Sequence, residues 1–103
     1  MYAESLTSLH MDYSYRTPDA SVETSITALR TWFAQLEKAM LEALNGLSDA
    51  DLVKIVDRGS LQLPVEFQYM VYREALLIFF AKVSVYLKAL EKPLPEQWRY
   101  WIS

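Results

Sequence analysis

The chain has no cysteine, and this absence excludes disulfides, thiolate metal sites and cysteine nucleophiles together. It also has no excess of basic residues: its net charge is −3 and no Lys/Arg cluster exists to release counterions from a nucleic acid. Only two of its 103 residues are glycine, whereas 52% are hydrophobic, which is typical of a packed helical protein and not of a disordered chain. The length of the chain predicts a single domain, 1–103. Its charge predicts that it has no nucleic-acid partner.

No hydrophobic run is long enough to predict a membrane span. The most apolar segment, Phe67–Leu90, is interrupted by Arg73, Glu74 and Lys82. Its longest uncharged stretch, Ala75–Ala81, is far below the roughly 18 apolar residues that a spanning helix needs. The first residues have no basic region followed by an apolar core, so we expect no signal peptide. Together with the absence of cysteine, this predicts a cytoplasmic protein.

The most informative segment runs from Pro64 to Lys92 and is apolar on most of its helical circumference. Proline is favourable at the first position of a helix, and Pro93 and Pro95 follow where this helix must end. Roughly 29 residues at about 1.5 Å rise each make a rod of about 43 Å. A helix with so little polar face must be surrounded by other helices, and a chain this short has few to offer. The sequence therefore predicts a homodimer.

A second long helix is indicated by a stripe of apolar residues. Its members repeat at alternating spacings of four and three: Val22, Ile26, Leu29, Phe33, Leu36, Met40 and Ala43. This heptad spacing favours near-parallel packing, as in helical bundles. The predicted elements are helices over about 3–15, 20–45, 48–56 and 64–92 and a short C-terminal turn over 95–102, in which Trp98, Trp101 and Ile102 fold back onto the bundle. No segment shows strand-like alternation bounded by turn signals.

Three sequence segments resemble a known family. They are Leu44–Leu52 (LNGLSDADL), Leu63–Val65 with the preceding Gly59, and Val83–Leu90 (VSVYLKAL) followed by Lys92-Pro93. Together they resemble the second half of a DinB-like (DinB/YfiT) protein, a superfamily of four-helix bundles. The resemblance covers most of residues 19 to 95, and on this alignment the first helix of the family has no counterpart.

The resemblance also bears on activity. Members of the family that catalyse reactions are similar to thiol-dependent transferases, and they hold a divalent metal by three histidines, two of them as a His-x-x-x-His pair on the fourth helix. At the positions of that pair this chain has Ala75 and Phe79, neither of which can bind a metal. The resemblance therefore implies a fold without the catalytic metal site and without a cofactor, leaving His10 as a ligand only if two subunits share a site.

Several other side chains are candidates for a binding site. Arg73 and Glu74 lie on the apolar helix and could bind a small charged ligand, although interhelical ion pairing is the commoner role of such residues. The aromatic side chains of this helix could line an apolar pocket, with packing in the core or the dimer as the alternative. The candidate ligand-pocket residues are Tyr69, Tyr72, Arg73, Glu74, Phe79 and Tyr86, within a wider aromatic set that includes Phe67 and Phe80.

The sequence thus predicts an all-α, up-and-down helical bundle of the DinB/YfiT type that is completed by dimerisation. The first functional hypothesis is a non-catalytic dimeric structural or binding module. The second is a metal-dependent thiol transferase or hydrolase whose site is degenerate or shared through His10 of two subunits. The third is a binder of small apolar ligands.

Overall fold

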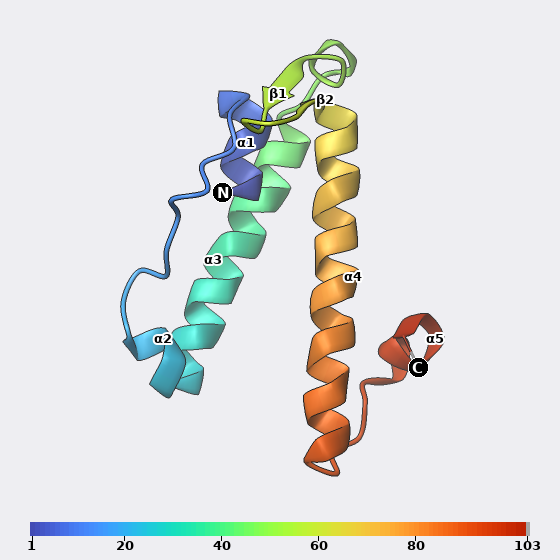
Figure 1. The fold of residues 1–103 in the computed structure, drawn as a ribbon. Helices are drawn as coiled ribbons and strands as arrows, with labels where there is room; N and C mark the ends of the chain where they lie inside the picture. Colours follow the sequence, from blue (N-terminus) through green and yellow to red (C-terminus); the bar gives the residue numbers. More distant parts are fainter. Residues whose placement is uncertain (103) are drawn as a thin grey trace. The chain divides into compact units, whose positions relative to one another are not determined.

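The computed structural model describes residues 1–102 and is mostly helical (Figure 1). In chain order the elements are α1 (Tyr2–Ser8), α2 (Ser21–Thr24), α3 (Ile26–Asn45), the 3-10 turn η1 (Asp49–Asp51), strands β1 (Ile55–Asp57) and β2 (Gln62–Pro64), α4 (Val65–Ala89) and α5 (Glu96–Ile102). The all-α class therefore holds for most of the chain, with a small hairpin as the exception. The chain forms two compact units, Met1–Tyr69 and Met70–Ser103, whose boundary lies within α4.

The N-terminal helix is shorter than the predicted 3–15, because α1 ends at Ser8. Leu9 has a left-handed backbone conformation (φ 59°), and its N–H donates to the Ser5 carbonyl. The chain then pairs with β1: the Met11 N–H donates to the Asp57 carbonyl, and the Asp57 N–H to the Leu9 carbonyl, both at 2.9 Å. Pairing with a distant strand therefore replaces the part of the predicted helix that follows Ser8.

The predicted helix over 20–45 is interrupted at Ser25. This residue is extended (φ −120°, ψ 116°), and its side chain accepts a hydrogen bond from the Ala28 N–H at 3.2 Å. Ser25 thereby satisfies one of the free donors at the start of α3, the usual role of a serine at this position. Both α1 and α2 pack against α3, α1 beside its C-terminal half and α2 beside its N-terminal end (Figure 1).

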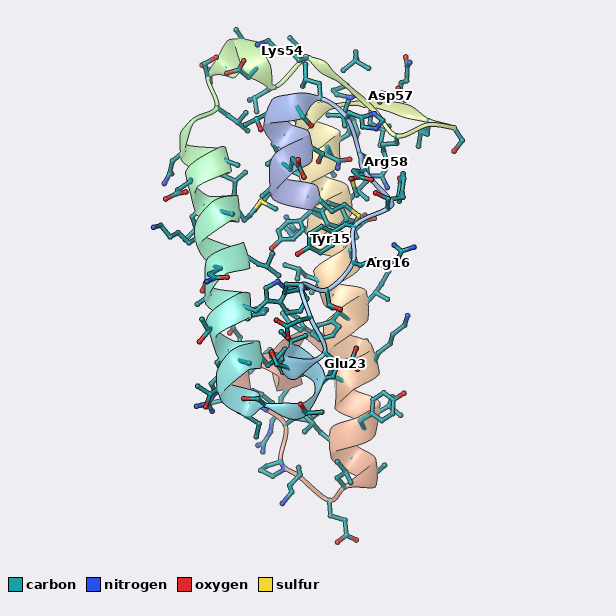
Figure 2. All side chains as sticks on the ribbon, turned by 90° about the vertical axis from the view of Figure 1, so that its left-hand side faces the viewer. Tyr15, Arg16, Glu23, Lys54, Asp57 and Arg58 are labelled. Atoms are coloured by element: carbon teal, nitrogen blue, oxygen red, sulfur yellow. The ribbon has the colours of Figure 1, made fainter. Side chains whose placement is uncertain are left out.

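The predicted helix over 48–56 is replaced by η1 and a β-hairpin. Strands β1 and β2 are antiparallel, with Val56 opposite Leu63, so the expectation that no strand occurs is wrong. The turn of the hairpin contains Gly59 in a left-handed conformation (φ 84°), which glycine adopts without steric cost. Figure 2 labels Asp57 and Arg58 at this hairpin. Val56 is fully buried, and its β-branched side chain is of the kind that packs well on a pleated strand.

Helix α4 begins one residue later than predicted and ends at Ala89, three residues before Lys92. Pro64 is not its first residue but the last residue of β2, where a proline is tolerated because this strand lies at the edge of a sheet. At the other end Glu91 has a positive φ (54°), and the Lys92 N–H donates to the Leu87 carbonyl at 2.8 Å. The helix thus ends by a left-handed turn before the prolines are reached.

The first unit has a small core in which apolar residues surround two buried polar side chains. Its buried apolar residues are Leu6, Met11, Val22, Met40, Val56 and Val65. Ser5 and Gln68 are fully buried among them. The buried residues therefore come from α1, the segment after it, α2, α3, the hairpin and the first turns of α4.

The second unit contains the rest of α4 and α5. The Trp98 ring stacks on the Phe80 ring, with 4.7 Å between the ring centroids and 29° between the planes. The Trp98 N–H donates to the Pro95 carbonyl at 3.0 Å and so begins α5. Within this unit the prediction that the C-terminal residues fold back therefore applies to Trp98, whereas the side chains of Trp101 and Ile102 lie outside the part of the chain that the structure describes.

Asp51 closes the η1 turn and makes the stability of this region depend on pH. Its carboxylate accepts a hydrogen bond from Lys54 Nζ at 2.6 Å, and from the backbone N–H and the hydroxyl of Ser48 at 2.8 and 2.7 Å. These donors, the lysine ammonium first, hold the pKa of Asp51 well below its ordinary value. Because the folded state has the lower pKa, the carboxylate stabilises the fold above about pH 4 and loses this effect as the pH falls further.

We therefore expect Asp51→Asn to lower the free energy of unfolding at pH 7 and to flatten its decline between about pH 4 and pH 2. Urea unfolding followed by circular dichroism at several pH values measures both effects. Asp49→Asn is the matched control. An Asp51→Asn protein that loses stability in acid as steeply as the unchanged chain would contradict this assignment.

Candidate functional site

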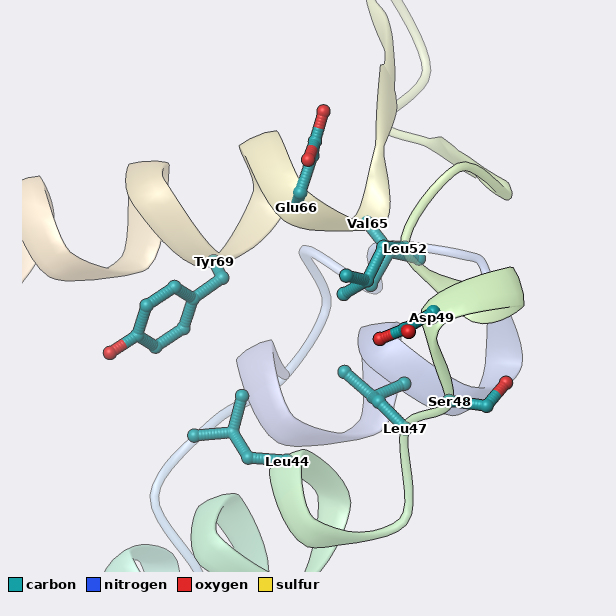
Figure 3. Close-up of a pocket in the computed structure, with 8 residues that line it drawn as sticks. All are labelled: Leu44, Leu47, Ser48, Asp49, Leu52, Val65, Glu66 and Tyr69. Carbon is teal, nitrogen blue, oxygen red and sulfur yellow. The ribbon is translucent and has the colours of Figure 1, made fainter.

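A pocket of about 240 Å³ lies in the first unit, where the end of α3 meets the beginning of α4 (Figure 3). Its lining is mostly apolar, and Ser48, Asp49 and Glu66 are its polar residues. The full lining consists of Leu44, Leu47, Ser48, Asp49, Leu52, Val65, Glu66 and Tyr69. A concave apolar surface with a few polar groups is the usual form of a small-molecule site. This pocket is therefore the candidate binding site of the chain.

The pocket walls are set by short-range structure. The Gly46 N–H donates to the Glu42 carbonyl and ends α3, and the capped η1 turn follows at once. The start of α4 is joined to this connection by two backbone hydrogen bonds, from the Glu66 N–H to the Leu52 carbonyl (3.1 Å) and from the Val65 N–H to the Lys54 carbonyl (2.9 Å). The two walls therefore belong to one hydrogen-bonded segment.

The pocket contains two carboxylates and no cationic side chain among its lining residues. Figure 3 shows the Asp49 carboxylate between the side chain of Leu47 and those of Leu52 and Val65, whereas the Glu66 carboxylate points away. Within residues 1–102, neither carboxylate accepts a hydrogen bond or forms an ion pair. Asp49, an exposed residue at the edge of the pocket, therefore places a negative charge without a protein partner beside apolar walls.

A second, smaller pocket of about 180 Å³ lies on the other side of the same connection. Leu6, Thr7 and Leu9 line it from the N-terminal segment, and Gly46, Leu47, Asp51 and Lys54 from the turn. Its two charged groups, Asp51 and Lys54, are already bound to each other at 2.6 Å. This pocket therefore offers no free charge to a ligand.

A buried polar cluster centred on Gln68 lies in the core of the first unit. Gln68 Nε2 donates to Ser5 Oγ (2.8 Å) and approaches Met11 Sδ (3.3 Å), while Gln68 Oε1 accepts from Arg58 Nη1 (2.6 Å). The Arg58 guanidinium also lies over the Tyr13 ring, 5.9 Å from its centroid. Every polar atom of the amide group has a partner, so the cluster is structural. Sequence reasoning missed it, and the one available signal was a glutamine inside an apolar helix.

His10 lies on the surface beside β1. Its Nδ1 is 4.0 Å from Asp57 Oδ2, and both side chains are more than half exposed. The carboxylate that forms this contact with the histidine belongs to Asp57. The nearby Ser8 hydroxyl donates to the His10 backbone carbonyl at 3.1 Å. Among the described residues no group of three His, Asp or Glu side chains could hold a metal.

Of the six predicted pocket residues, one lines the pocket between α3 and α4 and five do not. Tyr69 lines the pocket of the first unit. The other five, Tyr72, Arg73, Glu74, Phe79 and Tyr86, belong to the part of α4 in the second unit. Among these Phe79 and Tyr86 are 53% and 71% exposed, and Phe79 contacts Phe80 with ring centroids 6.0 Å apart. The pocket-forming leucines of the α3–η1 connection were not predicted as site residues.

Comparisons with known proteins give no relative: no family model, curated protein or solved structure matches the chain. The DinB-like resemblance therefore stays a prediction. Within the described residues no helix has the length and apolar character that crossing a membrane requires.

Proposed function

We propose that this chain is a non-catalytic helical module that acts as a homodimer. The observation that carries the proposal is the heptad stripe of α3. Of its residues, Val22, which lies in α2, and Met40 are buried, whereas those between them remain uncovered: Ile26 is 73% exposed, Leu29 44%, Phe33 56% and Leu36 40%. A contiguous apolar surface of this kind usually marks a site of protein association.

The charges around the stripe support the same proposal. Glu23, Arg30 and Glu37 flank it on the exposed surface and leave its apolar centre free of charge. Interfaces have this composition, an apolar centre with a polar rim. A second copy of the chain supplies an apolar stripe of matching length, which is the simplest partner for a heptad pattern.

The second unit offers further apolar surface on α4. Leu77, Ile78 and Val85 are 37%, 57% and 65% exposed. Ile78 and Val85 are seven residues apart and therefore share one face of α4, in the segment that is apolar on most of its helical circumference. The proposed dimer is therefore supported by exposed apolar residues in both units.

The proposal predicts a particle of twice the chain mass of 12.0 kDa in light scattering coupled to size-exclusion chromatography. Phe33→Glu places a charge at the centre of the stripe in both subunits, so we expect the dimer dissociation constant to rise by about two orders of magnitude or more. Sedimentation equilibrium measures this constant, and circular dichroism verifies that the variant stays helical.

Thr31→Glu is the matched control, because Thr31 is exposed on α3 but lies outside the stripe. This variant should remain a dimer. A monomeric mass for the unchanged chain at micromolar concentration contradicts the proposal, and so does equal dissociation in the Thr31→Glu and Phe33→Glu proteins.

A further inference from the structure

We infer that the pocket between the end of α3 and the start of α4 binds a small organic cation, a primary amine that carries a short apolar group. This inference goes beyond self-association. None of the uncovered stripe residues Ile26, Leu29, Phe33 and Leu36 lines the pocket. The two properties can therefore be separated by experiment.

The charge of the pocket selects the sign of the ligand. Asp49 and Glu66 are the charged residues of the lining, and both are acidic. The adjacent Asp51 already binds Lys54 and Ser48, so it cannot serve a ligand without losing these partners. Asp49 has no such partner in the part of the chain that the structure describes, and Figure 3 shows its carboxylate among the apolar side chains. An ammonium group gains an ion pair there, whereas an anion is repelled.

The walls of the pocket select an organic cation over a metal ion. Leu44, Leu47, Leu52 and Val65 supply no oxygen ligand, and Mg²⁺ or Ca²⁺ needs six or more of them. The same side chains, together with the Tyr69 ring, favour an aromatic or branched alkyl group. The volume of about 240 Å³ is below that of a typical drug-sized site, so the ligand is correspondingly small.

The test uses the full chain labelled with ¹⁵N and titrated at pH 7 with 2-phenylethylamine. We expect saturable shifts of the backbone amides in 47–52 and 65–69, with a dissociation constant of about 0.1–1 mM, as suits so small a ligand. The neutral 2-phenylethanol should bind at least about tenfold more weakly, and 3-phenylpropanoate should cause no shift. Equal affinities for the three compounds, or no saturable shift with the amine, overturn the inference.

Asp49→Asn removes the charge at almost constant shape. It should weaken the amine about tenfold and abolish the preference for amine over alcohol. Glu37→Gln, which removes an exposed charge of α3 outside the pocket, should leave both affinities unchanged. If Asp49→Asn binds the amine as tightly as the unchanged chain, the inference is wrong.

Two measurements keep the test independent of folding and of dimerisation. In the unchanged chain, raising the salt concentration should weaken the amine but not the alcohol, because salt screens the ion pair; equal responses would refute the role of Asp49. The Phe33→Glu protein should bind the amine as the unchanged chain does. Amine binding by a monomeric chain would thus leave this inference standing while the proposed dimer fails.

Discussion

Val56→Asp should unfold the first unit under conditions in which the unchanged chain is folded. Val56 is fully buried in β1, opposite Leu63, and the Arg58 guanidinium that reaches this core already donates to Gln68 Oε1, a hydrogen bond it would lose on pairing with a new carboxylate. A buried charge without a partner costs about 3–5 kcal/mol or more. This is comparable with the whole stability of a small domain, about 5–15 kcal/mol.

Urea unfolding followed by circular dichroism measures the effect, and Val53→Asp provides the control. Val53 is only three residues away but is 70% exposed, so the same substitution should change the free energy of unfolding by no more than about 0.5 kcal/mol. If both variants lose equal stability, Val56 does not occupy the buried position that the hairpin gives it. The comparison also tests the hairpin, because a helix over 48–56 would place Val53 and Val56, three residues apart, on the same face and in similar surroundings.

Gln68→Leu is expected to destabilise the chain by about 1–3 kcal/mol, although leucine is similar in size and more hydrophobic. The glutamine amide satisfies two partners, Ser5 Oγ and Arg58 Nη1, and Ser5 is fully buried. After the substitution the buried Ser5 hydroxyl still donates to the Tyr2 carbonyl but loses the donor that Gln68 supplied, and the partly buried Arg58 guanidinium loses its acceptor. The cost of these unsatisfied groups exceeds the gain from the added apolar surface.

A double-mutant cycle with Ser5→Ala isolates the hydrogen bond between these two side chains. Removal of both partners should cost less than the sum of the two single substitutions. Gln35→Leu is the control, since Gln35 is exposed on α3 and should tolerate the change within about 0.5 kcal/mol. Strict additivity in the cycle, or a Gln68→Leu protein more stable than the unchanged chain, would show that the cluster does not stabilise the fold.

The sequence predicted the helices where apolar periodicity is long and uninterrupted. The stripe from Ile26 to Ala43 identifies α3, and the run after Pro64 identifies α4, because a spacing of three and four fits no other regular structure. Prediction failed where a partner distant in sequence decides the conformation. Leu9 continues the helical spacing of α1, yet its carbonyl accepts a hydrogen bond from the Asp57 N–H, and no local pattern contains this information.

The pocket was less predictable than the helices. The sequence predicted that one helix ends at residue 45 and that another begins at 48; the Ser48–Asp51 cap is present, but it opens a 3-10 turn and not a helix over 48–56. Its leucines carry no chemical signal of a site, because the same residues form ordinary cores. They become a pocket only because backbone hydrogen bonds join Leu52 and Lys54 to the first turn of α4. Tyr69 was identified by its aromatic character alone.

The hydrogen bond between Gln68 and Ser5 joins residues 63 positions apart. Bringing such distant segments together costs loop-closure entropy before any contact repays it, and this slows folding. During synthesis α3 emerges before residue 68 and α1 can already pack against it, but Ser5 acquires its Gln68 partner only when the start of α4 follows. Consolidation of the N-terminal unit is therefore a late event on the ribosome, reached only after about two thirds of the chain has emerged.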